Sequence, residues 1–186
     1  MIGNVIAGMF AEGVSGDFES IATVSVGVSG SATIDFSSIP STYQHLQIRA
    51  IGKATGAGHE DLLVRVGNGS LDTGSNYTRH ALFGQGTSAA SQADINQSYA
   101  RVADNWAPPS SGSIYGVIVI EILDYANTNK FKTFRSLNGR DSNGSGAVGL
   151  FGNLWRSTSA IDTIRLYPAA NSFAQYSHFA LYGIKG

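Results

Sequence analysis

Residues 45–51 read HLQIRAI, a stretch in which Leu46, Ile48 and Ala50 fall on one side of an extended chain. Residues 62–66 (LLVRV) repeat the pattern, with an apolar residue at every second position. Alternation with a period of two is typical of a β-strand with one buried face. These two runs therefore predict sheets that pack one face against a core.

Outward from this stretch, the chain continues as short β-type runs separated by turn residues. Near the start of the chain, residues 21–28 and 31–36 are two such runs, and Ser29-Gly30 joins them into a predicted hairpin. The run at residues 114–123 (IYGVIVIEIL) is the most apolar and predicts a central strand buried on both faces. Residues 87–94 and 105–112 predict loops, and residues 95–103 carry no clear pattern. The further predicted strands are residues 21–28, 31–36, 77–83, 114–123, 130–137, 146–155, 160–167 and 177–184.

The composition agrees with an all-β chain. Charged residues make up 13% of the sequence, against about 25% in an average globular domain. Glycine contributes 23 of the 186 residues, which is well above its usual share. About ten short strands with glycine-rich turns predict a two-sheet antiparallel β-sandwich, with a jelly-roll-like topology as the leading choice.

Charge and cysteine content exclude several classes of function. Twelve Lys and Arg residues against 13 Asp and Glu residues give a net charge of -1, without a basic cluster, so we expect no nucleic-acid partner. No apolar run approaches the ~20 residues that span a bilayer, so we expect no membrane partner. The absence of cysteine excludes disulfides, thiolate metal sites and a cysteine nucleophile.

The N-terminal residues differ from the rest. Residues 1–19 form a predicted arm and residues 20–186 the β-sandwich domain. The arm has a helix-like spacing of apolar residues but is too short and too rich in glycine to hold a helix alone. We expect it to dock on a neighbouring subunit, with a frayed terminus as the alternative. The apolar residues of the arm are Ile2, Val5, Ile6, Met9 and Phe10.

Short motifs of catalysis or metal binding occur only in fragments. Residues 72–75 (DTGS) match the signature of pepsin-like proteases, but only one copy exists where two facing aspartates are needed, so a turn is predicted. Residues 141–146 (DSNGSG) resemble half of an EF-hand loop, but the twelfth position is Gly152 instead of a bidentate glutamate. A turn is predicted there too, with a weak surface cation as the alternative. We expect no catalytic residue, no metal site and no cofactor.

The aromatic residues admit two roles. Tryptophan and tyrosine stack on sugar rings when exposed, and they also fill cores and subunit interfaces. Tyr99, Trp106 and Tyr115 flank the proline pair at residues 108–109 and are predicted to lie at a subunit interface, whereas Trp106 and Trp155 are the leading candidates for a glycan contact.

Several longer phrases resemble a family of bacteriophage virion proteins that includes tail-fibre, tail-associated and head-decoration members. These are residues 36–49 (FSSIPSTYQHLQIR), 67–77 (GNGSLDTGSNY), 121–135 (EILDYANTNKFKTFR) and 155–185, which ends in LYGIK. The resemblance implies a non-enzymatic structural protein that assembles in the host cytoplasm and is located in the virion. The arm would then attach the protein to the virion.

Many chains of that family are longer and carry the domain after other modules, whereas here the predicted β-domain begins almost at once, which weakens the interpretation as a fibre because a fibre needs a shaft. A capsid decoration or cement protein is therefore expected, with itself (as a homotrimer) and a major capsid protein or tail component as partners. The alternative is a tail-fibre or tail-tip module that binds a receptor or a host-surface glycan.

Overall fold

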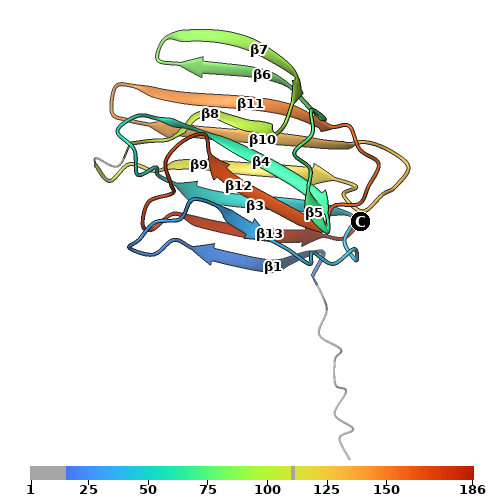
Figure 1. The fold of residues 1–186 in the computed structure, drawn as a ribbon. Helices are drawn as coiled ribbons and strands as arrows, with labels where there is room; N and C mark the ends of the chain where they lie inside the picture. Colours follow the sequence, from blue (N-terminus) through green and yellow to red (C-terminus); the bar gives the residue numbers. More distant parts are fainter. Residues whose placement is uncertain (1–15, 110–111) are drawn as a thin grey trace, which may run out of the picture.

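The computed structural model describes residues 16–109 and 112–186, and every regular element in these ranges is a β-strand. Thirteen described strands form two antiparallel sheets that pack face to face (Figure 1). The predicted all-β, two-sheet antiparallel sandwich is thus confirmed, while the jelly-roll topology stays a prediction. The first strand begins at Phe18, close to the predicted start of the domain at residue 20.

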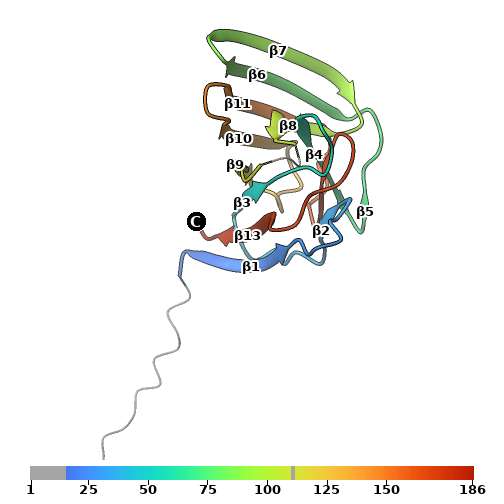
Figure 2. The ribbon, with the colours of Figure 1, turned by 90° about the vertical axis from the view of Figure 1, so that its left-hand side faces the viewer.

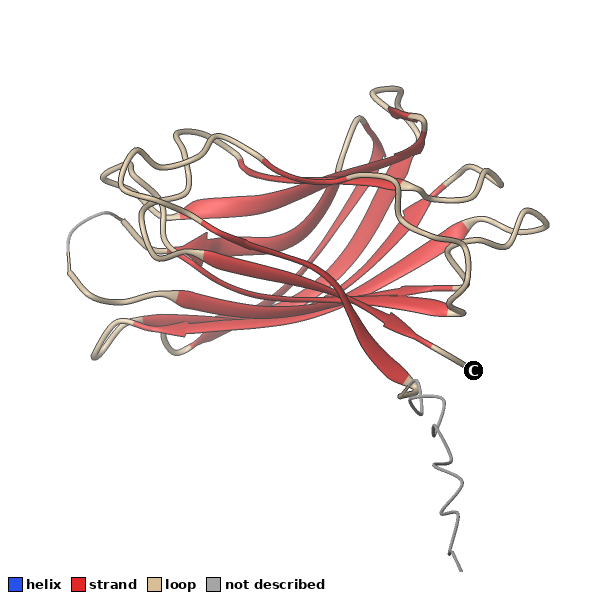
Figure 3. Cartoon of the chain, turned by 90° about the horizontal axis from the view of Figure 1, so that it is seen from below, coloured by secondary structure: helices blue, strands red, loops and turns tan. Residues whose placement is uncertain are grey.

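The large sheet contains eight strands. Its spatial order is β1 (Phe18–Ser25), β13 (His178–Ile184), β3 (His45–Gly52), β9 (Gly116–Leu123), β10 (Lys132–Asp141), β11 (Gly146–Trp155), β6 (Tyr77–Gln85) and β7 (Ser88–Gln97). The strand β13 therefore lies between two strands from the first third of the chain. In Figure 3 the strands of this sheet fan out with the twist that is usual for β-sheets.

The small sheet covers one face of the large sheet. Its order is β2 (Ile34–Phe36), β12 (Thr163–Pro168), β4 (Glu60–Asn68) and β5 (Ser70–Leu71), and β8 (Ala100–Ala107) pairs with the first part of β4. Figure 2 shows the small sheet on the right of the large sheet. No described strand covers the opposite face, which we call the outer face.

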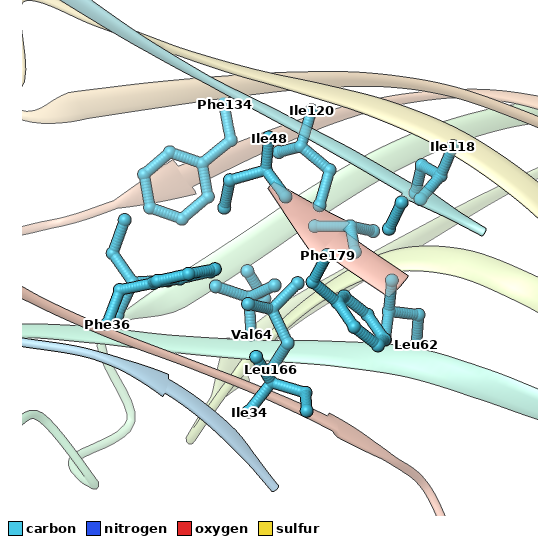
Figure 4. Packing of buried hydrophobic residues seen from close by; sticks show 14 of the residues in the cluster. Ile34, Phe36, Ile48, Leu62, Val64, Ile118, Ile120, Phe134, Leu166 and Phe179 are labelled. Atoms are coloured by element: carbon cyan, nitrogen blue, oxygen red, sulfur yellow. The ribbon is translucent and has the colours of Figure 1, made fainter. Parts of the chain in front are cut away.

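The core lies between the two sheets and follows the alternation expected from the sequence. Large apolar side chains of both inner faces interdigitate there (Figure 4). Side chains such as Ile48, Ile120, Val64 and Leu166 have no exposed surface. Burial of an aliphatic side chain of this size stabilises the fold by about 1.5–3 kcal/mol, so these alternating residues hold the two sheets together.

Three sequence predictions about strands were wrong. Residues 21–28 and 31–36 do not form a hairpin, because β1 pairs with β13 in the large sheet and β2 pairs with β12 in the small one. Residues 87–94 are not a loop but lie almost wholly in β7. The strand β9 is not buried on both faces, because Val117, Val119 and Leu123 point outward and are exposed.

An ion-pair cluster anchors the β6–β7 hairpin to the sandwich. Arg79 of β6 has only 2% of its side chain exposed, and its Nε lies 2.7 Å from Oδ2 of Asp94 in β7. Its Nη1 lies 2.7 Å from Oδ1 of Asp104 in β8, which belongs to the small sheet. The guanidinium thus joins three strands from two sheets through charge-assisted contacts.

Candidate interaction surface

A row of side chains crosses the outer face on five neighbouring strands. The register pairs Arg49 with Val119, Val119 with Leu137, Leu137 with Leu150, and Leu150 with Leu82. Residues that are directly opposite in antiparallel strands have Cβ atoms about 4.5–5.5 Å apart, so these side chains touch in sequence across β3, β9, β10, β11 and β6. Three consecutive leucines form its second half, which we call the leucine ridge (Leu137, Leu150 and Leu82).

A second row runs parallel to the first. It joins Ile51 to Val117, Val117 to Gly139, Gly139 to Val148, and Val148 to Gly84. The two glycines leave low points between the valines. Together the two rows give seven large aliphatic residues with 36–60% of their surface exposed, which we call the aliphatic patch: Ile51, Leu82, Val117, Val119, Leu137, Val148 and Leu150.

A hollow lies beside the leucine ridge. It has a volume of about 630 Å³ and spans β13, β3, β9, β10 and β11. Its lining includes Ile51, Val117, Leu137, Gly139, Val148 and Ala180. The outer face therefore carries a ridge toward β6 and an apolar depression toward β3.

Charged side chains border the patch and are paired on the same face. Arg135 donates from Nε to Oε2 of Glu121 at 2.8 Å, and the two residues are opposite each other in β10 and β9. Arg49 donates to Oε1 of Gln47 at 2.8 Å and lies over the stacked rings of Phe18 and Tyr182. The border is consequently polar but carries little unbalanced charge.

The two tryptophans are buried, so the predicted open platform for a glycan is wrong. Trp106 is 1% exposed and fills the space left by Gly52 and Gly116, where any side chain would overlap its atoms. Its ring meets Phe173 and Phe179 edge-on, at centroid distances of 6.5 and 6.3 Å. Paired glycines opposite a tryptophan are a core arrangement, so Trp106 is equally unavailable to another subunit.

Trp155 is 2% exposed and stabilises the turn at residues 72–75. Its indole Nε1 donates to Oδ2 of Asp72 at 2.7 Å, and Asp72 also accepts from Asn76 Nδ2 at 2.8 Å and from the amide of Gly74 at 2.7 Å. Partial burial raises the pKa of Asp72, but these three hydrogen bonds outweigh it and leave the pKa below its ordinary value of 3.8. The turn predicted at residues 72–75 is confirmed.

The other predicted aromatic contacts are separated in the structure. Tyr99 is half-buried just before β8, whereas Trp106 lies near the other end of that strand, and the role of Tyr99 at an interface stays a prediction. Tyr115 is half-buried, and its hydroxyl donates to the carbonyl oxygen of Gln175 at 3.0 Å. Sequence reasoning missed Tyr176, which is 72% exposed with a φ of +68°.

Tyr115 and Tyr176 border a second, smaller hollow. It has a volume of about 440 Å³, and Lys53 and Gln175 complete much of its lining. The ammonium of Lys53 lies 5.2 Å from the centroid of the Tyr115 ring, within the range of a cation–π contact. Aromatic rings beside polar donors suit a polar ring-shaped ligand better than the aliphatic patch does.

Residues 141–146 form the turn between β10 and β11, as predicted. Ser142 and Ser145 close the turn through a backbone hydrogen bond of 2.6 Å, and the amide of Asn143 donates to Oδ1 of Asp141 at 2.7 Å. Asn143 and Gly144 have φ values of +55° and +105°, which asparagine and glycine tolerate best. The described residues contain no group of three or more His, Asp or Glu side chains placed to hold a metal ion.

The remaining predicted residues are Ile2, Val5, Ile6, Met9 and Phe10, which lie outside the described residues. Within the described ranges, no helix is long and apolar enough to cross a membrane. Comparisons with protein-family models, with curated proteins and with solved structures found no match to this chain.

Proposed function

We propose that this chain is a non-enzymatic structural protein of a bacteriophage virion, a capsid decoration or cement protein that assembles as a homotrimer. The observation that carries the proposal is the aliphatic patch on the outer face. Contiguous apolar patches of this kind on a soluble protein mark contacts with other proteins. A decoration protein needs such a surface, because its task is to adhere to its own copies and to the capsid.

The position of the patch supports the same proposal. Its residues come from five neighbouring hydrogen-bonded strands, so the surface is rigid and already formed before a partner binds. Preorganised surfaces lose little conformational entropy on association. The phrase-level resemblance to virion proteins then supplies the setting, with the protein assembled in the host cytoplasm and located in the particle. The arm at residues 1–19 would add an attachment to the major capsid protein or to a tail component.

A second candidate function is a tail-fibre or tail-tip module that binds a receptor or a host-surface glycan. The exposed Tyr176 and the neighbouring Tyr115 favour it, because tyrosine rings beside Lys53 and Gln175 offer both stacking and hydrogen bonding to a sugar. A receptor-binding module would use this hollow, whereas a decoration protein would use the aliphatic patch.

Labelling of particles separates the two candidates. Virions are purified and incubated with gold-labelled antibody against the β-sandwich domain, and antibody saturated with the purified protein serves as control. We expect label over the capsid. Label confined to the tail tip would favour the receptor module, and particles without specific label would contradict both.

A deletion tests the attachment arm. Removal of residues 1–16 should leave a folded β-sandwich that no longer joins the particle, since β1 begins only at Phe18. Far-ultraviolet circular dichroism checks the fold, and cosedimentation with particles measures attachment. Unchanged cosedimentation of the truncated protein would refute the role of the arm.

A further inference from the structure

We propose that the outer face of the large sheet packs against the same face of other copies of this chain, with the leucine ridge of one copy seated in the apolar hollow of the next. This inference rests on the proposed self-assembly and assigns it to a surface. The assignment replaces the cluster of Tyr99, Trp106 and Tyr115 that the sequence suggested, since Trp106 is fully occupied in the core.

The first argument is shape. The leucine ridge lies on β10, β11 and β6, and the hollow beside it is lined from β13, β3, β9, β10 and β11, with Leu137 at the boundary between the two. A projection and a depression of matching apolar character therefore lie side by side on one face. The face is complementary to itself after a lateral shift along the sheet, so another copy provides the partner shape without any additional component.

The second argument is size. Eight strands spaced ~4.8 Å apart give a face roughly 34 Å wide, and strands of this length extend it to about 25 Å along the chain direction. The product is on the order of 800 Å² per subunit, an area that a subunit contacting two neighbours shares between them. The aliphatic patch forms its centre and the paired charges its border, as in the apolar core and polar rim of known interfaces.

The third argument is charge. Glu121 is neutralised by Arg135 on the same face, and the guanidinium of Arg49 is engaged by Gln47 and two aromatic rings. Of these three charges, Arg49 is then the one without an acidic partner among the described residues, and a strongly acidic or basic partner would find no cluster of opposite charge to select it. An uncharged aliphatic surface is best matched by another uncharged aliphatic surface, and this chain supplies one.

The lateral offset between ridge and hollow also bears on symmetry. Each copy can give its ridge to one neighbour and its hollow to another, which is a head-to-tail contact that closes into a ring when the rotation permits. Three copies with their outer faces toward a common axis satisfy every ridge and every hollow. A ring of three copies is the closed arrangement that agrees with the homotrimer of the proposed function.

The test places a charge on the ridge. Leu150→Asp is compared with the full-length wild type and with Val28→Asp, which introduces the same charge at a residue that is 84% exposed and lies outside the patch. Sedimentation velocity from about 1 to 100 µM measures association, which depends on protein concentration by mass action. We expect a trimer for the wild type and for Val28→Asp, and a monomer for Leu150→Asp, with association weakened at least 100-fold.

Further variants cover the remaining outcomes. If Leu150→Asp does not fold, as judged by circular dichroism, Leu82→Asp replaces it, because Leu82 is 60% exposed and lies in the same ridge. A wild type that stays monomeric at about 100 µM, or a ridge variant that associates like the wild type, would overturn the proposal. Loss of association on deletion of residues 1–15 as well as in Leu150→Asp would assign the face to that segment of a neighbour and overturn sheet-to-sheet packing. Antibody labelling of particles is independent of all these outcomes, so the virion assignment stands or falls separately.

Discussion

Replacing Asp72 by asparagine removes one charge from the turn that Trp155 closes. The carboxylate accepts three hydrogen bonds, from Trp155, Asn76 and Gly74, through its two oxygens. An asparagine keeps one acceptor oxygen and turns its amide group toward a donor. A net hydrogen bond to a charged group contributes about 1.5–3 kcal/mol, and Asp72 is partly solvated, so we expect a loss of about 2 kcal/mol in the free energy of unfolding at pH 7.

The matched control is Asp141→Asn. Asp141 is an exposed turn residue that accepts from a single backbone amide, and an asparagine oxygen accepts that bond equally well. Its free energy of unfolding should change by no more than about 0.5 kcal/mol. Both variants and the wild type are unfolded with urea at pH 7.

The pH dependence gives a second readout for Asp72. The pKa of Asp72 in the folded protein lies below the ordinary value of 3.8. The stability that its carboxylate contributes is therefore present above pH 3.8 and is lost as the pH falls through the folded pKa. The difference between the wild type and Asp72→Asn should therefore shrink when the urea experiment is repeated at pH 3. Equal stability of the two proteins at pH 7, or a difference that does not change with pH, would refute this reasoning.

Three further predictions concern the core and its edges. Gly116→Ala should cost about 3 kcal/mol in urea unfolding, because its Cβ would overlap the carbonyl oxygen of Trp106, whereas Gly152→Ala should be nearly neutral because its Cβ meets no atom. Burial raises the pKa of Tyr77, so the stability that its neutral hydroxyl contributes is fully present below pH 10 and is lost as the pH rises above 10. The difference in stability between the wild type and Tyr77→Phe should therefore narrow in thermal melts above pH 10. Arg79→Met should cost about 3 kcal/mol, because Asp94 loses its ion pair and Asp104 keeps only the longer contact with Arg101 at 3.5 Å. Hydrogen exchange should then rise first in the β6–β7 hairpin, and unchanged exchange there would contradict the anchoring role.

The sequence predicted the strands whose two faces differ in polarity. Residues 45–51 and 130–137 alternate because one face is in the core, and β3 and β10 lie where the alternation places them. The strand β7 was missed because both of its faces are exposed, so Ser, Ala, Gln and Asn replace the apolar residues that would reveal a period. The false hairpin has a different cause, since the partner of β1 is more than 150 residues away in the chain.

The sequence did not predict the candidate surface, because outward-facing apolar residues were interpreted as buried, as in β9. Val117 and Val119 are apolar although they point outward, so the strand was interpreted as buried on both faces. Continuous apolar runs indicate that both faces avoid water, and they do not tell which neighbour covers each face. The register was also needed, because most of the strands in the patch supply only one or two aliphatic residues each. Departures from local rules of this kind often mark functional surfaces.

The insertion of β13 between β1 and β3 has a consequence for biosynthesis. Among the described strands, β1 pairs with β13 alone, so β1 has no partner strand until more than 150 further residues have been synthesised. Closing a loop of this length is entropically costly, and folds dominated by such distant pairings form slowly. Until β13 is released, the edges of β1 and β3 remain open to other nascent chains. We therefore expect the large sheet to be completed only after β13 has been synthesised, and the yield of soluble protein to increase when synthesis is slowed by low temperature.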